Sequence, residues 1–124
     1  MGGGSVVDDR LRDAVLTYYQ RVDAGDLEGL LALFHPEVRY ERGGRDPIEG
    51  IDALRRFYQA ERLIREGRHQ LDAVLVEGDQ VAVRGVFRGI LKTGEEVAVR
   101  FADFYHFRDG LIWRRYSYFM DRFV

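Results

Sequence analysis

Residues 97–120 decide the fold, and they read VAVRFADFYHFR, DG and LIWRRYSYFM. On both sides of the Asp109-Gly110 pair, apolar and aromatic side chains alternate with polar ones, which is the pattern of strands that bury one face. An Asp-Gly pair between two such runs is the strongest short-range signal for a tight hairpin. This stretch is therefore predicted to form two antiparallel strands.

The same alternation extends the predicted sheet toward the N-terminus. Residues 71–77 and 81–91 are expected to be strands, and turn signals at residues 78–79 and 93–94 separate them from their neighbours. With the hairpin they would form an antiparallel meander. A further brief strand is expected at residues 38–40, ahead of a Gly-Gly turn.

Three helices are expected before the meander. Residues 7–22 place apolar side chains at three- and four-residue spacing, which is typical of an amphipathic helix. Gly25 is expected to cap this helix in the left-handed conformation, and Asp26 to be the N-cap of a second helix that Pro36 ends. A third helix would begin after Gly50 and end near Gly67. Helices that precede strands predict an α+β fold, with the three helices packed on a strongly curved, mostly antiparallel sheet.

The composition is that of one globular domain. The chain has 124 residues, of which 46% are hydrophobic, and this is enough for a single core. Residues 6–124 are predicted to form the domain. Residues 1–5 are expected to be a flexible tail or an added linker, because glycine dominates them.

Charge and motif content exclude several classes of function. The formal net charge is -2 and the charges are interspersed, which argues against nucleic acid or a membrane as the partner. The absence of cysteine excludes a disulfide framework, a thiol nucleophile and cysteine-ligated zinc. Neither a histidine pair at metal spacing nor a glycine-rich phosphate loop occurs, so no metal and no cofactor are predicted. No apolar segment reads as a membrane span or a secretory signal, and a cytoplasmic location is expected.

Asp103 is the one carboxylate in a row of apolar and aromatic side chains. By alternation the row consists of Val97, Val99, Phe101, Asp103, Tyr105 and Phe107. Loss of hydration should raise the pKa of this carboxyl group unless a cation lies beside it. Two interpretations stay open: Asp103 is a functional acid, or it pairs with Arg84 or Arg115 as a buried structural bridge.

The neighbours of Asp103 depend on the register of the last hairpin. A plain two-residue loop would place Asp103 opposite Tyr116. A bulge would shift the pairing by one residue and bring Arg115 or Ser117 to that face. Either register remains possible at this point.

The three histidines are not expected to be functional. His35 is interpreted as a cap at the end of the second helix, where a donor or a cation is favourable. His69 lies in a polar stretch and is expected to be solvated. His106 falls on the opposite face of its strand from Asp103, which weakens any His-Asp pair.

Four segments together resemble a known group of proteins: YYQRVDAGDLEG at 18–29, LALFHPEV at 31–38, GIDALRRFY at 50–58 and FYHFRDGLI at 104–112. They are similar to the nuclear transport factor 2-like superfamily, in its SnoaL-like and ketosteroid-isomerase-like branch. The resemblance covers essentially the chain after Val6. It implies helices and a curved sheet around a conical cavity, in a superfamily that hosts isomerases, cyclases, dehydratases, epoxide hydrolases and non-enzymes.

The resemblance carries over to individual residues only in part. Tyr18 stands at the place of an oxyanion-binding tyrosine of the ketosteroid isomerases, and Asp103 at the place of their protonated aspartic acid. The place of their general base is taken by Arg42. An arginine of the epoxide hydrolases is matched by Arg84, but Ser117 stands where those enzymes have an aspartate in the last strand.

The resemblance favours a small-molecule enzyme of the SnoaL-like type. It would act by acid/base or oxyanion-stabilising chemistry on a hydrophobic, oxygenated substrate that is polyketide- or ketone-like, as an isomerase or cyclase. Asp103 and Tyr18 would be its catalytic residues. The substrate would be bound by Tyr40, Arg42, Tyr58, Arg84, Phe101, Tyr105 and Tyr116.

The missing base motivates a second hypothesis, a non-catalytic ligand-binding or dimerisation module with the same fold. Arg42, Arg84 and Arg100 would then suit a carboxylate-bearing ligand. Under both hypotheses the expected partners are a hydrophobic small molecule and a second copy of the chain. A homodimer through the sheet is expected because its outer face would expose apolar side chains, namely Ala102, Phe104, Ile112 and Tyr118.

Overall fold

A six-stranded sheet with helices on one of its faces makes up the computed structural model, in which residues 6–124 are described. The predicted tail at residues 1–5 lies outside the described residues. The helical elements are α1 (Val6–Asp23), α2 (Leu27–Leu31), α3 (Ile51–Arg56) and the π-helical turn η1 (Phe57–Glu61). The strands are β1 (Phe34–Arg42), β2 (Ile48–Glu49), β3 (Ile64–Glu77), β4 (Gln80–Leu91), β5 (Glu96–Arg108) and β6 (Leu111–Phe119). The α+β class predicted from the sequence is confirmed.

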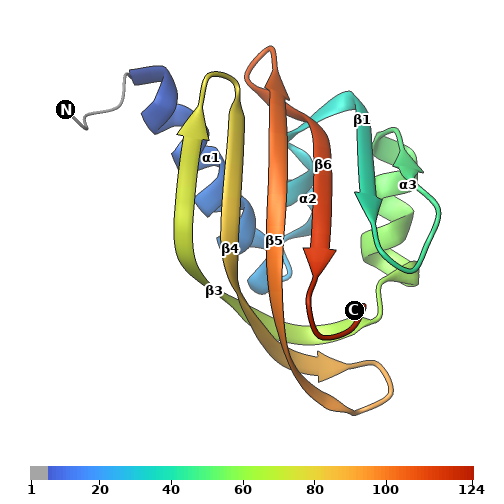
Figure 1. Ribbon diagram of the computed structural model, residues 1–124. Coiled ribbons are helices and arrows are strands. Elements are labelled where there is room, and N and C mark those ends of the chain that lie inside the picture. Colours follow the sequence, from blue (N-terminus) through green and yellow to red (C-terminus); the bar gives the residue numbers. More distant parts are fainter. Residues whose placement is uncertain (1–5) are drawn as a thin grey trace.

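The strand order is β2-β1-β6-β5-β4-β3. All neighbours are antiparallel except β1 and β6, which pair in parallel. The meander from β3 to β6 is the one that the turn signals predict. Figure 1 shows these four strands in front of α1 and α2, which cover the far face of the sheet.

The first two helices meet as the cap chemistry predicts. Gly25 has a φ of 72°, the left-handed region that glycine adopts without steric cost. The carboxylate of Asp26 then accepts a hydrogen bond from the backbone N–H of Gly29 at 3.0 Å, which satisfies a free donor at the start of α2.

The second helix is shorter than predicted. It ends at Leu31, and both Phe34 and Pro36 belong to β1. Proline cannot donate to a strand ladder, but Pro36 lies in an irregular stretch of the pairing between β1 and β6, where no such bond is needed. The prediction of a helix up to Pro36, with His35 as its cap, is therefore wrong.

The third helix also ends early. The helical region stops at Glu61, and β3 begins at Ile64, so the prediction of a helix up to Gly67 is wrong. Gly67 pairs with Gly89 of β4, and a Cβ atom on Gly67 would stand 2.3 Å from the ring of Phe87. This glycine permits the close approach of strand and ring and is not a helix stop.

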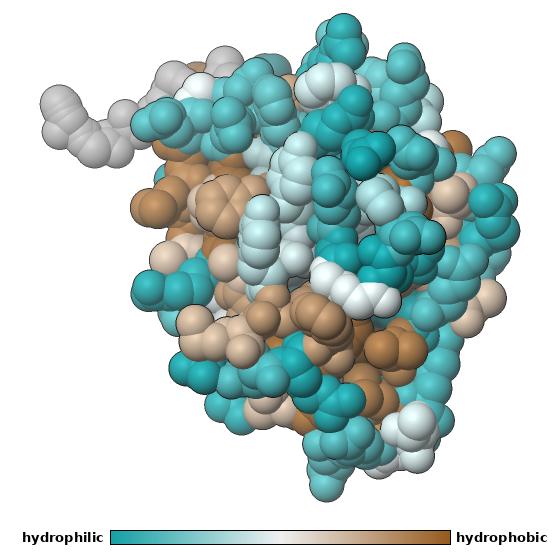
Figure 2. Space-filling model, turned by 45° about the vertical axis from the view of Figure 1, so that its right-hand side comes forward, coloured by the Kyte–Doolittle hydropathy of each residue, from teal (hydrophilic) through white to brown (hydrophobic). Residues whose placement is uncertain are grey.

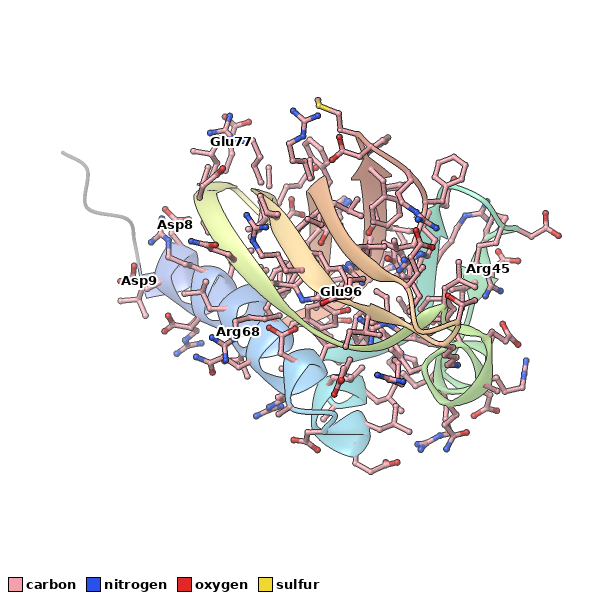
Figure 3. The ribbon with its side chains drawn as sticks, turned by 90° about the horizontal axis from the view of Figure 1, so that it is seen from below. Asp8, Asp9, Arg45, Arg68, Glu77 and Glu96 are labelled. Carbon is pink, nitrogen blue, oxygen red and sulfur yellow. The ribbon has the colours of Figure 1, made fainter. Side chains whose placement is uncertain are left out.

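The core fills the space between α1 and the concave face of the sheet. Seen from below in Figure 3, the sheet curves over the side on which the helices lie. Arg45, labelled at the right of Figure 3, lies near the helical turns of α3 and η1. It forms an ion pair with Glu61, the last residue of η1, at 2.8 Å. Several core side chains carry hydroxyl groups, since Tyr18, Tyr19 and Tyr105 are all buried. None of the helices in the described part of the chain is long and apolar enough to cross a membrane.

Candidate functional site

A bulge in β6 decides which side chains enter the core. The register shifts between His106 and Phe107, and Trp113 is the extra residue that has no partner in β5. Asp103 consequently faces Ser117, and Tyr105 faces Arg115. Of the two registers left open by the sequence, the bulged one is present.

Asp103 is a buried anion held by three side chains. Arg115 donates from Nη2 to Oδ2 at 2.9 Å, Ser117 donates to Oδ1 at 2.5 Å, and Tyr19 donates its hydroxyl to Oδ2. Burial alone would raise the pKa of Asp103, but the charge of Arg115 and the three donors together keep the pKa below its ordinary value. The neutral, hydrogen-bond-donating acid that the resemblance implies is therefore a wrong prediction, and the structural bridge to Arg115 is confirmed.

Arg115 and a group of tyrosines extend this polar cluster. Arg115 donates from Nη1 to the hydroxyl of Tyr18 at 2.8 Å and to that of Tyr58 at 3.3 Å, and those two hydroxyls also bond to each other. Burial raises the pKa of Tyr18 and of Tyr105 well above the ordinary tyrosine value, so both hydroxyls are neutral. The hydroxyl of Tyr105 donates to that of Tyr19 at 2.7 Å.

One donor of Arg115 is left over. The guanidinium is only 4% exposed and lies over the rings of Tyr18 and Tyr40 at 4.5 and 4.4 Å. Its Nε is buried and has no hydrogen-bond acceptor among residues 6–124. Burial lowers the pKa of Arg115, but the neighbouring carboxylate of Asp103 outweighs this and raises it, so the guanidinium keeps its charge.

His69 forms a second, half-buried pair, with Asp23 at the end of α1. Its Nδ1 lies 2.6 Å from Oδ1 of Asp23, and its backbone N–H donates to Oδ2 at 2.8 Å. The imidazole is 10% exposed and packs on the rings of Phe87 and Phe101, with centroids 4.9 and 5.4 Å apart. The prediction that His69 is solvated is wrong, because β3 begins earlier than expected and places this side chain opposite Phe87 on the concave face.

The two pairs border the same internal cavity. Its free volume is about 20 Å³, which is room for one water molecule. The lining includes His69, Asp103, Arg115, Ser117, Tyr18, Tyr40, Arg42, Arg62, Phe101, Phe119 and Val124. The open conical cavity that the resemblance implies is thus largely filled by side chains.

Three larger surface pockets share lining residues with this cavity. One, of about 440 Å³, is lined by Arg84 and Arg100 on the outer face and shares Phe101 and Phe119 with the cavity. Another has a volume of about 370 Å³ and shares Arg42, Ser117 and Phe119 with it. A third has a volume of about 460 Å³ and shares Arg62, Ile64 and Phe87 with it.

Most of the predicted site residues come together. Tyr18, Tyr40, Arg42, Phe101 and Asp103 line the cavity. Tyr58 and Tyr105 join the cluster through their hydroxyl groups. Alternation placed Phe101, Asp103 and Tyr105 on the inner face correctly, and the resemblance pointed to Tyr18 and Arg42.

Arg84, Tyr116 and Arg100 are not brought to the cavity. Arg84 points to the outer face of the sheet and pairs with Asp72 at 2.8 Å. Tyr116 lies opposite Phe104 on that same outer face, because the bulge turns it outward. Arg100 pairs with Asp121 at 2.6 Å. The expectation that these side chains share a pocket with Asp103 is wrong.

Sequence reasoning missed Tyr19, Asp23, Arg62 and His69. The period-two pattern from residue 67 to residue 77 could have placed His69 on the inner face, had β3 not been expected to start at Leu71. Among residues 6–124, no group of three acidic or histidine side chains gathers in a way that could hold a metal ion.

Solved structures share this fold at low sequence identity. A protein of unknown function from Burkholderia pseudomallei, described as NTF2-like, superposes with a TM-score of 0.82 at 22% identity and covers 90% of this chain and 91% of its own. A candidate SnoaL-like polyketide cyclase from Jannaschia sp. CCS1 gives 0.83 at 18% identity, covering 96% and 91%. TerC, co-crystallised with polyporic acid, gives 0.78 at 21% identity, covering 90% and 92%.

Among curated proteins, none matches the chain. Residues 15–115 match the SnoaL-like domain family, which is most of the sequence. The curved six-stranded sheet with its helices and the superposition on an NTF2-like structure agree with that match. The chain therefore belongs to the SnoaL-like domain family, within the nuclear transport factor 2-like superfamily.

Proposed function

We propose that the protein is a small-molecule enzyme that transfers a proton on a hydrophobic, oxygenated substrate of the polyketide or ketone kind, as an isomerase or cyclase. Membership in the SnoaL-like family supports this proposal. Fold neighbours described as a candidate polyketide cyclase and as a complex with polyporic acid are consistent with it. The side chains around the internal cavity supply the chemistry.

The observation that carries the proposal is the free Nε2 of His69. An ionised carboxylate only accepts hydrogen bonds, so Nδ1 of His69 donates its proton to Asp23 and leaves the lone pair on Nε2. No hydrogen-bond partner of Nε2 occurs in the described part of the chain. Asp103, in contrast, already accepts three hydrogen bonds beside a cation and is the poorer base. His69 would take the place of the base that the sequence comparison missed.

Arg115 and Tyr18 would stabilise the oxyanion that forms when the proton leaves. Arg115 has its unused Nε, and Tyr18 has a neutral hydroxyl in the same buried cluster. Fixed donors in a dry site contribute about 10²- to 10³-fold to a rate. Asp103 would be a positioning residue, because its contacts hold both Arg115 and Tyr19 in place.

Exchange of carbon-bound hydrogen tests this proposal. Ketones such as 2-tetralone, dissolved in heavy water, should exchange their α-protons for deuterium faster when the protein is present, as followed by proton NMR. His69→Gln should slow the exchange by about 10²- to 10⁴-fold, the usual contribution of a general base. Asp23→Asn should slow it less. Arg84→Gln changes only the outer face and is the matched control. An unchanged rate in a folded His69→Gln variant would contradict the proposal.

A non-catalytic ligand-binding module is the second candidate function, supported by Arg42, which stands where the ketosteroid isomerases have their general base. In that case ketones or aromatic acids would raise the melting temperature of the protein, but the protein would not speed the exchange of α-protons in any ketone tested. The same NMR assay, run alongside a thermal-shift measurement, separates the two candidates.

We also propose a homodimer through the outer face of the sheet. Phe104 and Tyr118 are 45% and 59% exposed there, and their rings make an edge contact with centroids 5.8 Å apart. Met120, 72% exposed, follows at the end of β6.

Ile112, which was expected on this face, is buried in the core because the bulge reverses the alternation. Figure 2 shows hydrophobic patches in the turned view, separated by hydrophilic side chains. Two copies could cover such patches by an isologous contact.

A further inference from the structure

The Nε–H group of Arg115 is a buried donor that no group in the described part of the chain accepts. The side chain is only 4% exposed. The rest of the guanidinium is fixed, because Nη2 donates to Asp103 and Nη1 donates to the hydroxyls of Tyr18 and Tyr58. The group therefore cannot turn to find an acceptor for Nε. Native proteins rarely bury a donor without a partner, and such a donor calls for an explanation.

His69 offers the opposite kind of unused group, a hydrogen-bond acceptor. Its Nδ1 lies 2.6 Å from the carboxylate of Asp23 and carries the proton between them, so Nε2 has a lone pair. No donor to Nε2 occurs within residues 6–124. The imidazole is 10% exposed, and the rings of Tyr19, Phe87 and Phe101 pack around it at centroid distances of 5.0, 4.9 and 5.4 Å. Bulk water thus has little access to this ring.

The donor and the acceptor belong to side chains that line the same internal cavity. Arg115 and His69 both border the space of about 20 Å³, and neither lines any of the three larger surface pockets. Asp103, Ser117 and Tyr18 add polar groups to the lining. A polar cavity of this size holds one water molecule, whereas the empty cavities of proteins are apolar. The partner of Arg115 is therefore expected inside this cavity.

Only a ligand that both donates and accepts can serve the two groups together. A halide ion would accept from Nε of Arg115 but has no proton to donate to Nε2 of His69. A metal cation would lie against a guanidinium that always keeps its positive charge. A water molecule is neutral and has two protons and two lone pairs, so it matches a free donor and a free acceptor at once.

We propose that the cavity binds a single water molecule, which accepts a hydrogen bond from Nε of Arg115 and donates one to Nε2 of His69. This water joins the two pairs into one network, which runs from Asp23 through His69 and Arg115 to Asp103. Where it concerns His69 as the base, this inference rests on the proposed function. The water site itself is tested without any substrate.

Arg115 also decides how the water is oriented. A hydrogen bond from Nε occupies a lone pair of the water oxygen, so the two protons of the water point away from the guanidinium. One of them is then available to Nε2 of His69, which has to be the unprotonated ring nitrogen. Asp23 requires the same tautomer, because it accepts from Nδ1. Contacts at both ring nitrogens thus hold His69 in the Nδ1–H form.

A crystal structure of the full chain at atomic resolution tests this inference directly. One water is expected within about 3.2 Å of both Nε of Arg115 and Nε2 of His69. His69→Phe keeps an aromatic ring beside Phe87 but has no acceptor, so this water should be lost from the density. Arg84→Gln, on the outer face, should retain it. In solution, NMR magnetisation transfer between the Nε proton of Arg115 and a long-lived water should be present in the wild type and absent in His69→Phe.

A wild-type cavity without ordered water, or a water in reach of only one of the two nitrogens, would overturn the proposal. A water that keeps its position in His69→Phe would also overturn it. The wild-type density decides by itself if His69→Phe fails to fold. The ordered water without any ketone exchange rejects the proposed proton transfer alone, and ketone exchange without this water rejects the water site alone.

Discussion

At the scale of single residues, Asp103 shows how a buried carboxylate can be central to a site without being its acid. Its three donors and its burial make it part of the scaffold that fixes Arg115. Asp103→Asn leaves the guanidinium of Arg115 buried without its counter-charge. Removing one partner of a buried pair destabilises a protein by about 3–5 kcal/mol, so the free energy of unfolding near pH 7 should fall by that amount in urea titrations.

The stability lost in Asp103→Asn should also depend on pH. Because the pKa of Asp103 is lower in the folded chain than the ordinary value of about 3.9, its stabilising contribution is present above about pH 4 and lost as the pH falls further. The difference in free energy of unfolding between wild type and Asp103→Asn should therefore be smaller near pH 3 than near pH 7. Asp72→Asn, in the exposed pair with Arg84, is the control and should cost less than about 1 kcal/mol. Equal stability of wild type and Asp103→Asn near pH 7 would refute the scaffold role.

At the scale of elements, turn chemistry was predictable and strand starts were not. The Gly25-Asp26 junction and the turns of the meander follow from local rules that hold in this structure. The starts of β1 and β3 do not, because short apolar runs fit a helix and a strand equally well until a partner strand pairs with them. Pairing with β4 takes residues 64–67 into the sheet.

The wrongly predicted starts of β1 and β3 explain in part which residues of the site were predicted from the sequence and which were missed. Alternation along β5 identified Asp103 as a lone acid, and that prediction needed no tertiary information. Whether Arg115 or Tyr116 accompanies it depends on one bulged residue, Trp113, which no turn signal marks. His69 was missed because its strand was expected to begin later. Its partner Asp23 lies 46 residues away in the chain, beyond the reach of local patterns.

At the scale of the whole molecule, the outer sheet face predicts self-association. Light scattering should give twice the chain mass of 14.4 kDa, since two copies can cover Phe104 and Tyr118. Tyr118→Asp should give the single mass, because it places a charge in the contact. Leu75→Asp is the control, as Leu75 is also exposed but lies on β3, at the edge of the sheet. A wild-type protein of single mass at high concentration would remove the dimer.

The proton-accepting nitrogen of His69 is the point on which the functional account depends most, and nitrogen-15 NMR of the ring observes it without any substrate. With the imidazole neutral, the account predicts a proton on Nδ1, facing Asp23, and a bare Nε2. Asp23→Asn should shift the ring toward the other tautomer. A wild-type His69 with its proton on Nε2 would contradict the account, because the ring nitrogen that has no protein partner would then be a donor and not a base.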